Sequence, residues 1–478
     1  METLSQRMTS MESVQLRGIA VAIVTASALY YVLPAAISHI QLSALPMLGK
    51  TEVVVIPPKL LSELSKSPRT LSAEIAGNEF IAGKYTKVKA LTPILLHSIT
   101  KYLIPSLGRN AVIMSEEVSN AVRLGIPPCN DWTAVKIYPK IMRMVTVSTG
   151  RFLVGSELNR SEEYIDTVHN YALDVSSAQS AVHKMHPWLR PLLAEWLPEI
   201  RRLRKRTEEA FALFESLIKE RMDMQRELSE SELPDDLLQW MIANRHNYNN
   251  EDAHDLVYSQ LGLTFTANHS TASTITNALY TLATMGDLID VIRDDITQGL
   301  EESGGQFTSK ALDSMWKFDS FIKETVRMNP LVMSVAVRKV VEPIKLPSGQ
   351  VIPTGVTLET PLVAVNLDDQ IFPNADVFDP MRFYNLREND RKQGDARDAE
   401  FNQLTSSSTS HMSWGFGKHT CPGRAFAAQQ IKMILAHIIL RYDIKLVGHS
   451  TDRYENIPKG HLSLPDPTKD ILMKRREI

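Results

Sequence analysis

A cysteine between glycines is the residue of this sequence best suited to chemistry. The stretch SWGFGKHTCPGRAF, residues 413–426, contains Cys421, one of two cysteines in the chain. Gly417 and Gly423 let the backbone bend closely around the sulfur or approach a flat ligand. An apolar run at helical spacing follows, which predicts that Cys421 lies at a helix N-terminus, where free N–H groups favour a thiolate. Such a thiolate suits nucleophilic catalysis or ligation of a soft metal centre.

Two other interpretations of Cys421 remain open at this point. A free cysteine is most often a small buried hydrophobe. A cysteine protease would need a general-base histidine, and the positions of the 13 histidines relative to the thiol are not fixed by the sequence. The second cysteine, Cys129, lies far away in the sequence, so no disulfide framework is implied and a reducing compartment is expected.

The glycine-flanked loop WGFGKHTCPGR resembles the haem-binding loop of cytochrome P450 enzymes, the haem–thiolate monooxygenases, whose usual form is Phe-x-x-Gly-x-Arg/His-x-Cys-x-Gly. Four positions match the pattern, and one aromatic residue replaces another: Gly417, His419, Cys421 and Gly423 match, and Trp414 stands for the Phe. The resemblance implies that the Cys421 thiolate is the axial ligand of the haem iron.

Two further motifs of the same family follow the expected order along the chain. The tetrapeptide ETVR contains Glu324 and Arg327, which lie three apart and therefore on one face of a helix. The later FDPMRF resembles the family's Pro-x-Arg-Phe element and adds Arg382. The resemblance implies a Glu–Arg–Arg cluster that stabilises the region beneath the haem loop. Glu324 and Arg327 alone could equally be an exposed helix pair of little energetic value.

The apolar run of residues 251–285 is expected to be a long helix through the centre of the protein. Its TANHST stretch, residues 266–271, resembles the family's Ala/Gly-Gly-x-Asp/Glu-Thr element over the oxygen-binding face of the haem. His269 stands where an acid is usual, Ser270 where Thr is usual, and Thr271 follows. The resemblance implies a helix bulge and proton delivery by these residues, since His can relay protons near neutral pH. Hydrogen bonds that only cap the bulge are the alternative.

The resemblance also implies contacts with the haem propionates and with the substrate. Trp132 and Lys136 in DWTAVK resemble a helix that meets a propionate, Arg338 in SVAVRK resembles the strand arginine, and His419 serves the same carboxylates. The predicted substrate pocket is formed by Phe265, Thr266, Asn268, Val332, Met333 and Val335.

The remaining elements predict a mainly α fold with a small β portion, over residues 332–360, and one large haem domain, residues 41–478, behind an N-terminal segment, residues 1–40. Within that segment, residues 18–38 carry no charge. At 1.5 Å per residue they reach about 31 Å, the thickness of a bilayer core. We expect a single membrane anchor at the endoplasmic reticulum with the haem domain in the cytosol; a buried or interfacial helix is the alternative. The segment HPWLRPLLAEWLPEI, residues 186–200, fits a membrane interface or core packing equally well.

Composition and resemblance together limit the function. A net charge of −3 argues against attraction to nucleic acid. The motif sequences are most similar to those of fungal members that oxidise terpenoids and related secondary metabolites. This resemblance implies a small lipophilic substrate and electrons from a membrane-bound NADPH reductase. A haem–thiolate isomerase or dehydratase, independent of dioxygen and reductase, remains an alternative, as does a non-catalytic membrane haem protein.

Overall fold

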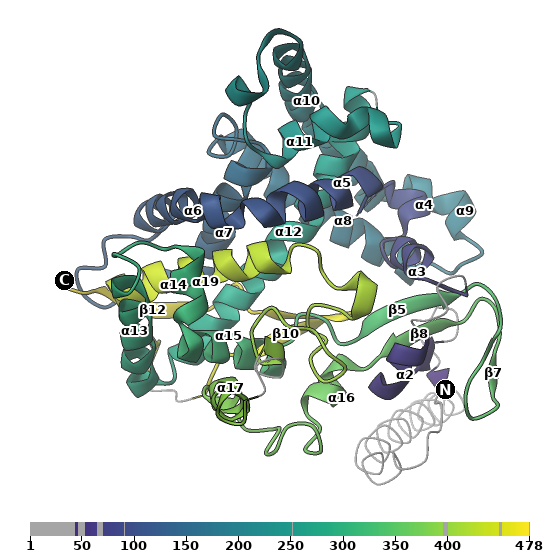
Figure 1. Ribbon diagram of the computed structural model, residues 1–478. Helices are drawn as coiled ribbons and strands as arrows, with labels where there is room; N and C mark the ends of the chain where they lie inside the picture. Colours follow the sequence, from purple (N-terminus) through teal and green to yellow (C-terminus); the bar gives the residue numbers. More distant parts are fainter. Residues whose placement is uncertain are drawn as a thin grey trace, which may run out of the picture. The chain divides into compact units, whose positions relative to one another are not determined.

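The computed structural model describes residues 44–45, 53–64, 70–89, 91–250, 252–394, 400–448 and 452–477. Contacts separate residues 1–45 from residues 46–478, and the second unit carries nearly all described elements. Helices predominate and the strands are short, so the prediction of a mainly α fold with a small β portion is confirmed (Figure 1). The helices of the second unit are α2 Pro58–Leu64, α3 Ala73–Phe80, α4 Gly83–Thr86, α5 Pro93–Ser98, α6 Ile104–Gly125, α7 Ile137–Leu153, α8 Glu162–Lys184, α9 Arg190–Leu193, α10 Pro198–Glu227, α11 Leu237–Asn244, α12 Ala253–Leu282, α13 Gly286–Glu301, α14 Ser309–Ser314, α15 Trp316–Met328, α16 Leu362–Asn366, α17 Arg382–Lys392 and α19 Arg424–Arg441.

The expected membrane anchor, residues 18–38, lies outside the described residues, so it stays a prediction. Among the helices that the structure describes, none combines the length and the apolar character needed to cross a bilayer.

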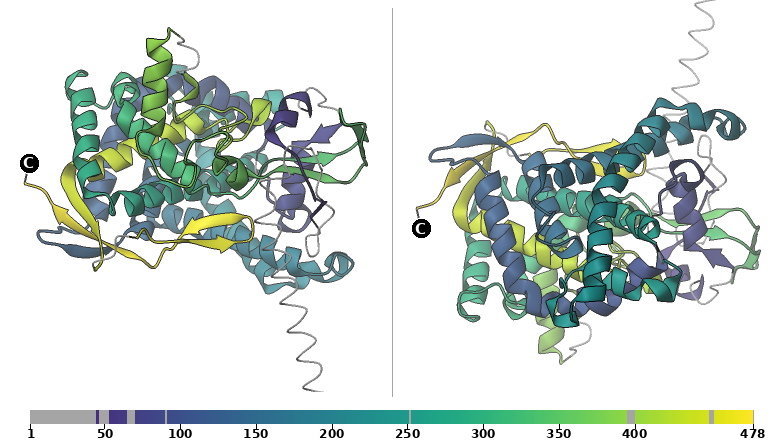
Figure 2. Two further views of the ribbon diagram at one scale, coloured as in Figure 1. Left: turned by 90° about the horizontal axis from the view of Figure 1, so that it is seen from below. Right: turned by 90° about the horizontal axis from the view of Figure 1, so that it is seen from above.

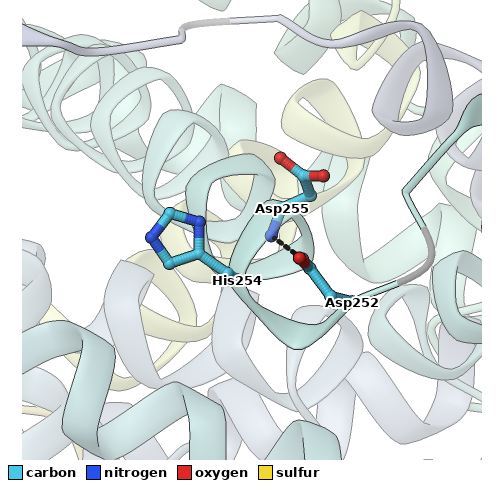
Figure 3. A group of neighbouring side chains, drawn as sticks. All are labelled: Asp252, His254 and Asp255. Carbon is cyan, nitrogen blue, oxygen red and sulfur yellow. Dashed lines mark hydrogen bonds between the residues drawn. The ribbon is translucent and has the colours of Figure 1, made fainter.

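The long helix α12 runs through the core, as the apolar sequence of residues 251–285 predicts. It contacts α7, α8, α10, α15 and α19. Asp252 caps its N-terminus, where the carboxylate accepts a hydrogen bond of 2.9 Å from the backbone N–H of Asp255 (Figure 3). His254 packs against the ring of Phe211 at 4.7 Å, and Asp255 lies 4.0 Å from the ammonium of Lys89. The grouping of two carboxylates and an imidazole at this end is therefore explained by capping and packing.

Two sheets flank the helices and lie far from each other in the fold. The first has the strand order β2–β8–β5–β3, and the second has the order β4–β12–β9. In Figures 1 and 2 the β5–β8 pair and the β12 strand are at opposite ends of the helical body. The strands are β2 Val53–Val55, β3 Leu71–Ser72, β4 Thr133–Lys136, β5 Val335–Val340, β6 Ile344–Lys345, β7 Val351–Ile352, β8 Thr357–Thr360, β9 Tyr442–Leu446, β10 Asn456–Lys459, β11 Leu462–Pro465 and β12 Asp470–Arg475.

A buried ion pair joins α10 to the N-terminus of α11, next to the loop that follows α7. The guanidinium of Arg221 lies 3.0 Å from the carboxylate of Asp236, and both side chains are 1% exposed. The loop passes over this pair at Gly155, whose φ is +90°. A Cβ there would lie 2.6 Å from Arg221 Nη2 and 2.8 Å from Asp236 Oδ2. Only glycine therefore satisfies both the backbone conformation and the close approach.

Replacing Gly155 by alanine is expected to destabilise the protein by about 2 kcal/mol, because the methyl group is overpacked against charged atoms that cannot move without losing their pairing. Gly349→Ala is the matched control, since Gly349 has a φ of +87° but open space where a Cβ would go. Denaturant unfolding measures both variants. Equal losses for the two variants would show that backbone strain alone, and not the ion pair, requires Gly155.

Candidate active site

The loop that carries Cys421 is fixed by its own backbone immediately before α19. The N–H of Cys421 donates a hydrogen bond of 2.7 Å to the carbonyl oxygen of Trp414. Gly417 has a φ of +65° and Gly415 a φ of +85°, and a Cβ on Gly415 would lie 3.0 Å from the His419 carbonyl oxygen. Gly415 is thus the glycine whose side chain the fold excludes, which the sequence reasoning missed.

Gly423 precedes α19 as its N-cap with a φ of −87°, and no described protein atom lies within 4 Å of where its Cβ would be. Among protein atoms the tight position of the loop lies at Gly415, and the predicted approach of Gly423 to a flat ligand stays a prediction. The helix start itself is where the sequence expected it.

Two opposing effects act on the Cys421 thiol. Burial raises the pKa of Cys421, whereas backbone N–H groups of Gly423 and Arg424 and the charge of Arg424 lower it. Burial is the larger effect, and the N–H groups at the helix start act in the direction that the sequence predicts. A bound metal cation deprotonates a coordinating thiol outright. The donor set therefore fits a buried iron ligand better than a free nucleophile.

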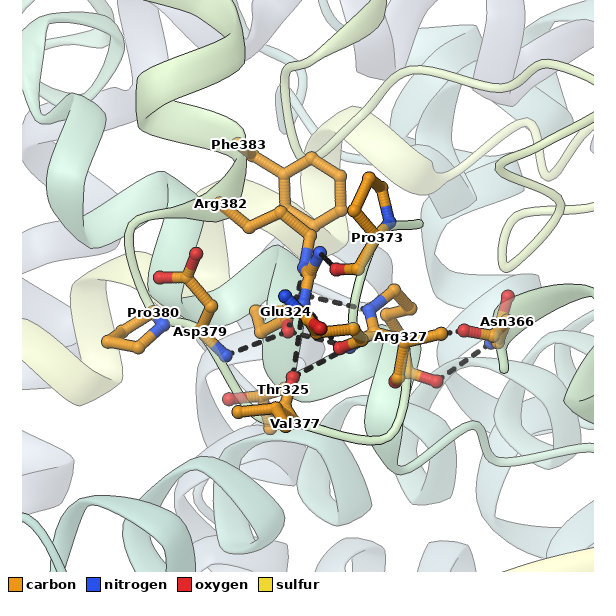
Figure 4. Close-up of polar contacts among 12 residues, drawn as sticks. Glu324, Thr325, Arg327, Asn366, Pro373, Val377, Asp379, Pro380, Arg382 and Phe383 are labelled. Atoms are coloured by element: carbon orange, nitrogen blue, oxygen red, sulfur yellow. Dashed lines mark hydrogen bonds and ion pairs between the residues drawn. The ribbon is translucent and has the colours of Figure 1, made fainter. Parts of the chain in front are cut away.

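Glu324, Arg327 and Arg382 form one buried cluster (Figure 4). The Glu324 side chain is 0% exposed and lies 2.7 Å from Arg327 Nη2 and 3.2 Å from Arg382 Nε. Its Oε1 atom also accepts a hydrogen bond of 3.0 Å from the backbone N–H of Asp379. The structure brings together the three residues that the sequence assigned to this cluster, and the exposed-pair alternative does not hold.

The two arginines of this cluster also bind backbone carbonyl groups of the segment that precedes α17. The guanidinium of Arg327 donates 2.7 Å to Ala375 O, and that of Arg382 donates 2.7 Å to Pro373 O. The Asn366 amide returns a hydrogen bond of 2.8 Å to the Arg327 carbonyl oxygen. The cluster therefore holds residues 366–382 against α15.

Arg338 and His419 line one cavity of about 40 Å³ between the first sheet and the cysteine loop. Burial lowers the pKa of Arg338, and none of the described residues that line this cavity is acidic. Burial, followed by the charges of Arg338 and Lys418, lowers the pKa of His419. A partly buried guanidinium with no counter-ion among the described lining residues suits a ligand carboxylate. These residues fit a haem propionate.

The structure does not bring Trp132 and Lys136 to that cavity. The expected helix is wrong: residues 133–136 form strand β4, in which Lys136 pairs with Asp470 of β12. Trp132 is 38% exposed, and the ammonium of Lys445 lies 3.9 Å from its ring centroid. This sheet lies at the end of the fold opposite β5 (Figures 1 and 2). Strand pairing, which the local spacing did not reveal, thus separates both residues from Arg338.

The middle of α12 exposes a face although its flanks are buried. Thr266 is exposed, and Ser270 and Thr274 are partly exposed on the same face. The Thr266 and Ser270 hydroxyls donate to the carbonyl groups four residues earlier, at 3.2 and 3.4 Å. Thr271, also predicted here, is buried and donates 3.1 Å to Ala267 O. An accessible hydroxyl face inside a central helix fits a ligand site.

His269 points to a different set of neighbours. Its Nδ1 lies 3.4 Å from the Tyr138 hydroxyl, its ring lies 5.9 Å from the ring of His169, and its buried Nε2 has no partner among the described residues. Burial, reinforced by His169, lowers the pKa of His269 to about 4. The imidazole is therefore neutral near pH 7. The expected bulge is also absent, because α12 continues as α-helix through residues 266–271.

The predicted substrate residues come from two segments of the structure: residues 265–268 of α12, and residues 332–335 at the start of β5. Val332 bridges to Leu462, and the N–H of Met333 donates 2.9 Å to His461 O, so the β10–β11 hairpin adjoins this segment. The sequence reasoning missed this hairpin, because only strand pairing brings it there. Phe265 and Val332 are partly buried, Thr266 and Met333 are exposed, and Asn268 and Val335 are buried.

Comparison with known proteins agrees with this geometry. The family model for cytochrome P450 matches residues 113–473. The chain is 97% identical over all 478 residues of both chains to "Cytochrome P450 monooxygenase ATR3" of Stachybotrys chlorohalonatus. It is 32% identical over 427 residues to "Cytochrome P450 monooxygenase BOA4" of Botryotinia fuckeliana, covering 88% of this chain and 84% of the relative. The solved structure of a retinoic acid-bound cyanobacterial CYP120A1 shares the fold, with a TM-score of 0.69, 16% identity, and coverage of 91% of this chain and 92% of that one.

The fold and the site thus define a haem–thiolate oxygenase. The chain belongs to the cytochrome P450 family and is a monooxygenase, as the sequence resemblance predicted. Its cofactor is haem with a cysteine thiolate ligand, and its electrons come from NADPH through a reductase.

Replacing Glu324 by glutamine is expected to lower the free energy of unfolding by about 3–5 kcal/mol, because two buried guanidinium groups lose their carboxylate. Glu162→Gln is the control, since its pair with Arg143 is largely exposed. Denaturant unfolding should show almost no change for this control. A loss at Glu324 no larger than that of the control would contradict the role of the cluster.

Proposed function

We propose that this protein transfers one atom of dioxygen to a small lipophilic molecule, a terpenoid or related fungal secondary metabolite, with Cys421 as the axial ligand of the haem iron. The observation that carries the assignment of Cys421 is its place in the fold. It lies two residues after His419, which lines one cavity together with Arg338, and none of the described residues that line this cavity is acidic. One loop would thus supply both the sulfur ligand and a carboxylate partner of one cofactor.

The haem supplies the oxidising chemistry, and electron donation from a thiolate favours O–O bond cleavage. The residues of this chain would bind the haem, orient the substrate and keep water out of the site. Arg338 and His419 would hold the propionates, and the N–H groups of Gly423 and Arg424 would stabilise the thiolate charge. The Ser270 hydroxyl would hold a water on the accessible face of α12.

His269 would act as a neutral hydrogen-bonding group in this scheme. With a pKa of about 4, it does not exchange a proton with water near pH 7 as an imidazolium would. The hydroxyl face of Thr266 and Ser270 is therefore the better candidate for holding the water molecules that supply protons. The apolar side chains of Phe265 and Val332 would bring the substrate beside this face and keep further water out.

Contact with a membrane, which the N-terminal run predicts, is also supported by a surface of the described residues. Trp188, Leu192 and Trp196, around α9, are 85%, 71% and 68% exposed. The guanidinium of Arg201 lies 5.1 Å from the ring centroid of Trp196, so charge borders the apolar surface. Exposed aromatic and aliphatic side chains next to cations are typical of a segment that enters a bilayer interface. This surface supports contact with a membrane, where lipophilic substrates partition, and the endoplasmic reticulum remains the membrane that we expect from the sequence.

The oxygenase assignment is tested with membranes that contain this protein and a reductase, incubated with apolar fungal extracts under heavy dioxygen. A product that carries the heavy atom only when NADPH is present is expected, and mass spectrometry identifies the substrate in the same experiment. A new product that forms without NADPH and carries no label would replace the proposal with an isomerase or dehydratase.

The membrane surface is tested by indole fluorescence with a quencher fixed inside lipid vesicles. The chain has six tryptophans, none of them before residue 132. Quenching should be strong in the wild type and mostly lost in the Trp188→Phe, Trp196→Phe double variant, while Trp132→Phe, at the opposite sheet, keeps it. Unchanged quenching in the double variant would show that this surface stays out of the bilayer.

A further inference from the structure

Lys323 is a buried lysine that the Glu–Arg–Arg cluster does not use. It precedes Glu324 on α15 and is 4% exposed. Its ammonium donates to three acceptors of one loop: Phe401 O at 2.9 Å, Gln403 O at 2.8 Å and Ser406 Oγ at 2.7 Å. Three acceptors match the three donors of an ammonium group. The side chain therefore ties α15 to residues 401–406.

The ammonium of Lys323 is surrounded by dipoles and a ring, and none of the described carboxylates forms an ion pair with it. The Phe383 ring centroid lies 4.7 Å from Lys323 Nζ. Asp319, one turn earlier on α15, is held by Lys432 at 2.5 Å and accepts from the backbone N–H of Leu404 at 2.8 Å. The cation at Lys323 is thus stabilised mainly by neutral groups.

The charged and titratable groups that face Lys323 come from several elements. Burial lowers the pKa of Lys323 to about 7; the charge of Asp319 opposes this shift, and the smaller effect of Arg387 on α17 adds to it. His411 stays neutral, because burial and then the charges of Lys323 and Arg327 lower its pKa. The ammonium of Lys323 therefore holds its proton less tightly than an exposed lysine does.

The residues that bind Lys323 alternate with residues that hold the cysteine loop. The indole N–H of Trp414 donates 2.7 Å to Leu404 O, and the guanidinium of Arg424 donates 3.2 Å to Thr405 O. The Ser407 hydroxyl donates 2.6 Å to Gly415 O. Each of these contacts fixes a residue on one side of Cys421. A displacement of residues 401–406 would therefore move the loop.

We propose that Lys323 is a positioning residue for Cys421, which it serves by fixing the segment that holds Trp414, Gly415 and Arg424. The Glu324 cluster fixes a different segment, residues 366–382. Helix α15 therefore holds two separate segments through two different sets of side chains. The proposal rests on the proposed role of Cys421 as the haem ligand, and adds the residue that keeps the loop in the ligating geometry.

The test uses the full-length holoprotein and the absorption band of its ferrous carbon monoxide form, whose position distinguishes a thiolate from a neutral thiol. Lys323→Met is expected to convert from the thiolate form at least fivefold faster than the wild type. Lys317→Met is the matched control, because Lys317 lies on the same helix and its ammonium faces the ring of Tyr384, at 5.9 Å, instead of the loop. Equal conversion rates for the two variants would overturn the proposal.

Ser406→Ala is a milder variant that keeps the lysine and removes one acceptor. It is expected to convert about twofold faster than the wild type, and it decides the question if Lys323→Met yields no folded protein. A wild-type rate for Ser406→Ala, in that case, counts against the proposal. If the wild type itself shows no thiolate band, the proposed role of Cys421 fails instead, so the two failures are distinguishable.

A pH series separates the lysine's ionisation from simple packing. The folded pKa of Lys323 is lowered to about 7, and that of an unfolded lysine is about 10.4. Between these values the unfolded chain binds the additional proton, so this group makes stability rise with pH. Lys323→Met is expected to lose that slope in the midpoint of thermal unfolding, and Lys317→Met to keep it. An unchanged slope in Lys323→Met would contradict the assignment of a buried, titrating ammonium.

Discussion

A carboxylate removed from water is the constraint on which this part of the structure depends. Glu324 is fully buried, and two guanidinium groups and a backbone N–H offset the loss of water around its oxygens. Those guanidiniums have further donors, which the backbone carbonyl groups of residues 366–377 satisfy. One buried charge thus fixes a long irregular segment to α15, where sheet or helix pairing is not present to do so. With Lys323 one residue earlier, the same helix also holds the segment that leads to Cys421.

The two faces of the site differ in how they treat charge. On the cysteine side, burial raises the pKa of the thiol. Arg338 has no carboxylate partner among the described residues that line its cavity. An iron cation would stabilise the thiolate, and the propionate groups of the haem would pair with the Arg338 guanidinium. On the side of α12, the accessible groups are neutral: the hydroxyls of Thr266 and Ser270, and an imidazole at His269 that stays uncharged near neutral pH. Such a face can order water and receive an apolar substrate without a strong field.

The sequence predicted what is encoded by short spacing. The Glu324 and Arg327 pair, the helix start after Cys421 and the long apolar helix α12 all depend on neighbours within a few turns. The failures involve residues far apart in the chain. Trp132 and Lys136 were assigned to a helix from the resemblance of their motif. That assignment failed because β4 is defined only by pairing with β12, more than three hundred residues later. The partners of Lys323 lie 78 to 83 residues away, and the need for glycine at position 415 depends on the path of the returning backbone at His419. The pKa of His269 likewise follows from burial by α7 and α8, which its own helix does not reveal.

The central claim is that Cys421, and not the other cysteine, binds the haem iron in this protein. The most direct measurement compares Cys421→Ser with Cys129→Ser by the absorption spectrum of the ferrous carbon monoxide complex. Cys129 is buried, at 3% exposure, and Cys421 is partly buried, so Cys129 controls for the loss of a cysteine sulfur from the interior. The account predicts that Cys129→Ser keeps the band of the thiolate-ligated form and that Cys421→Ser loses it. A thiolate band that survives in Cys421→Ser would contradict the account.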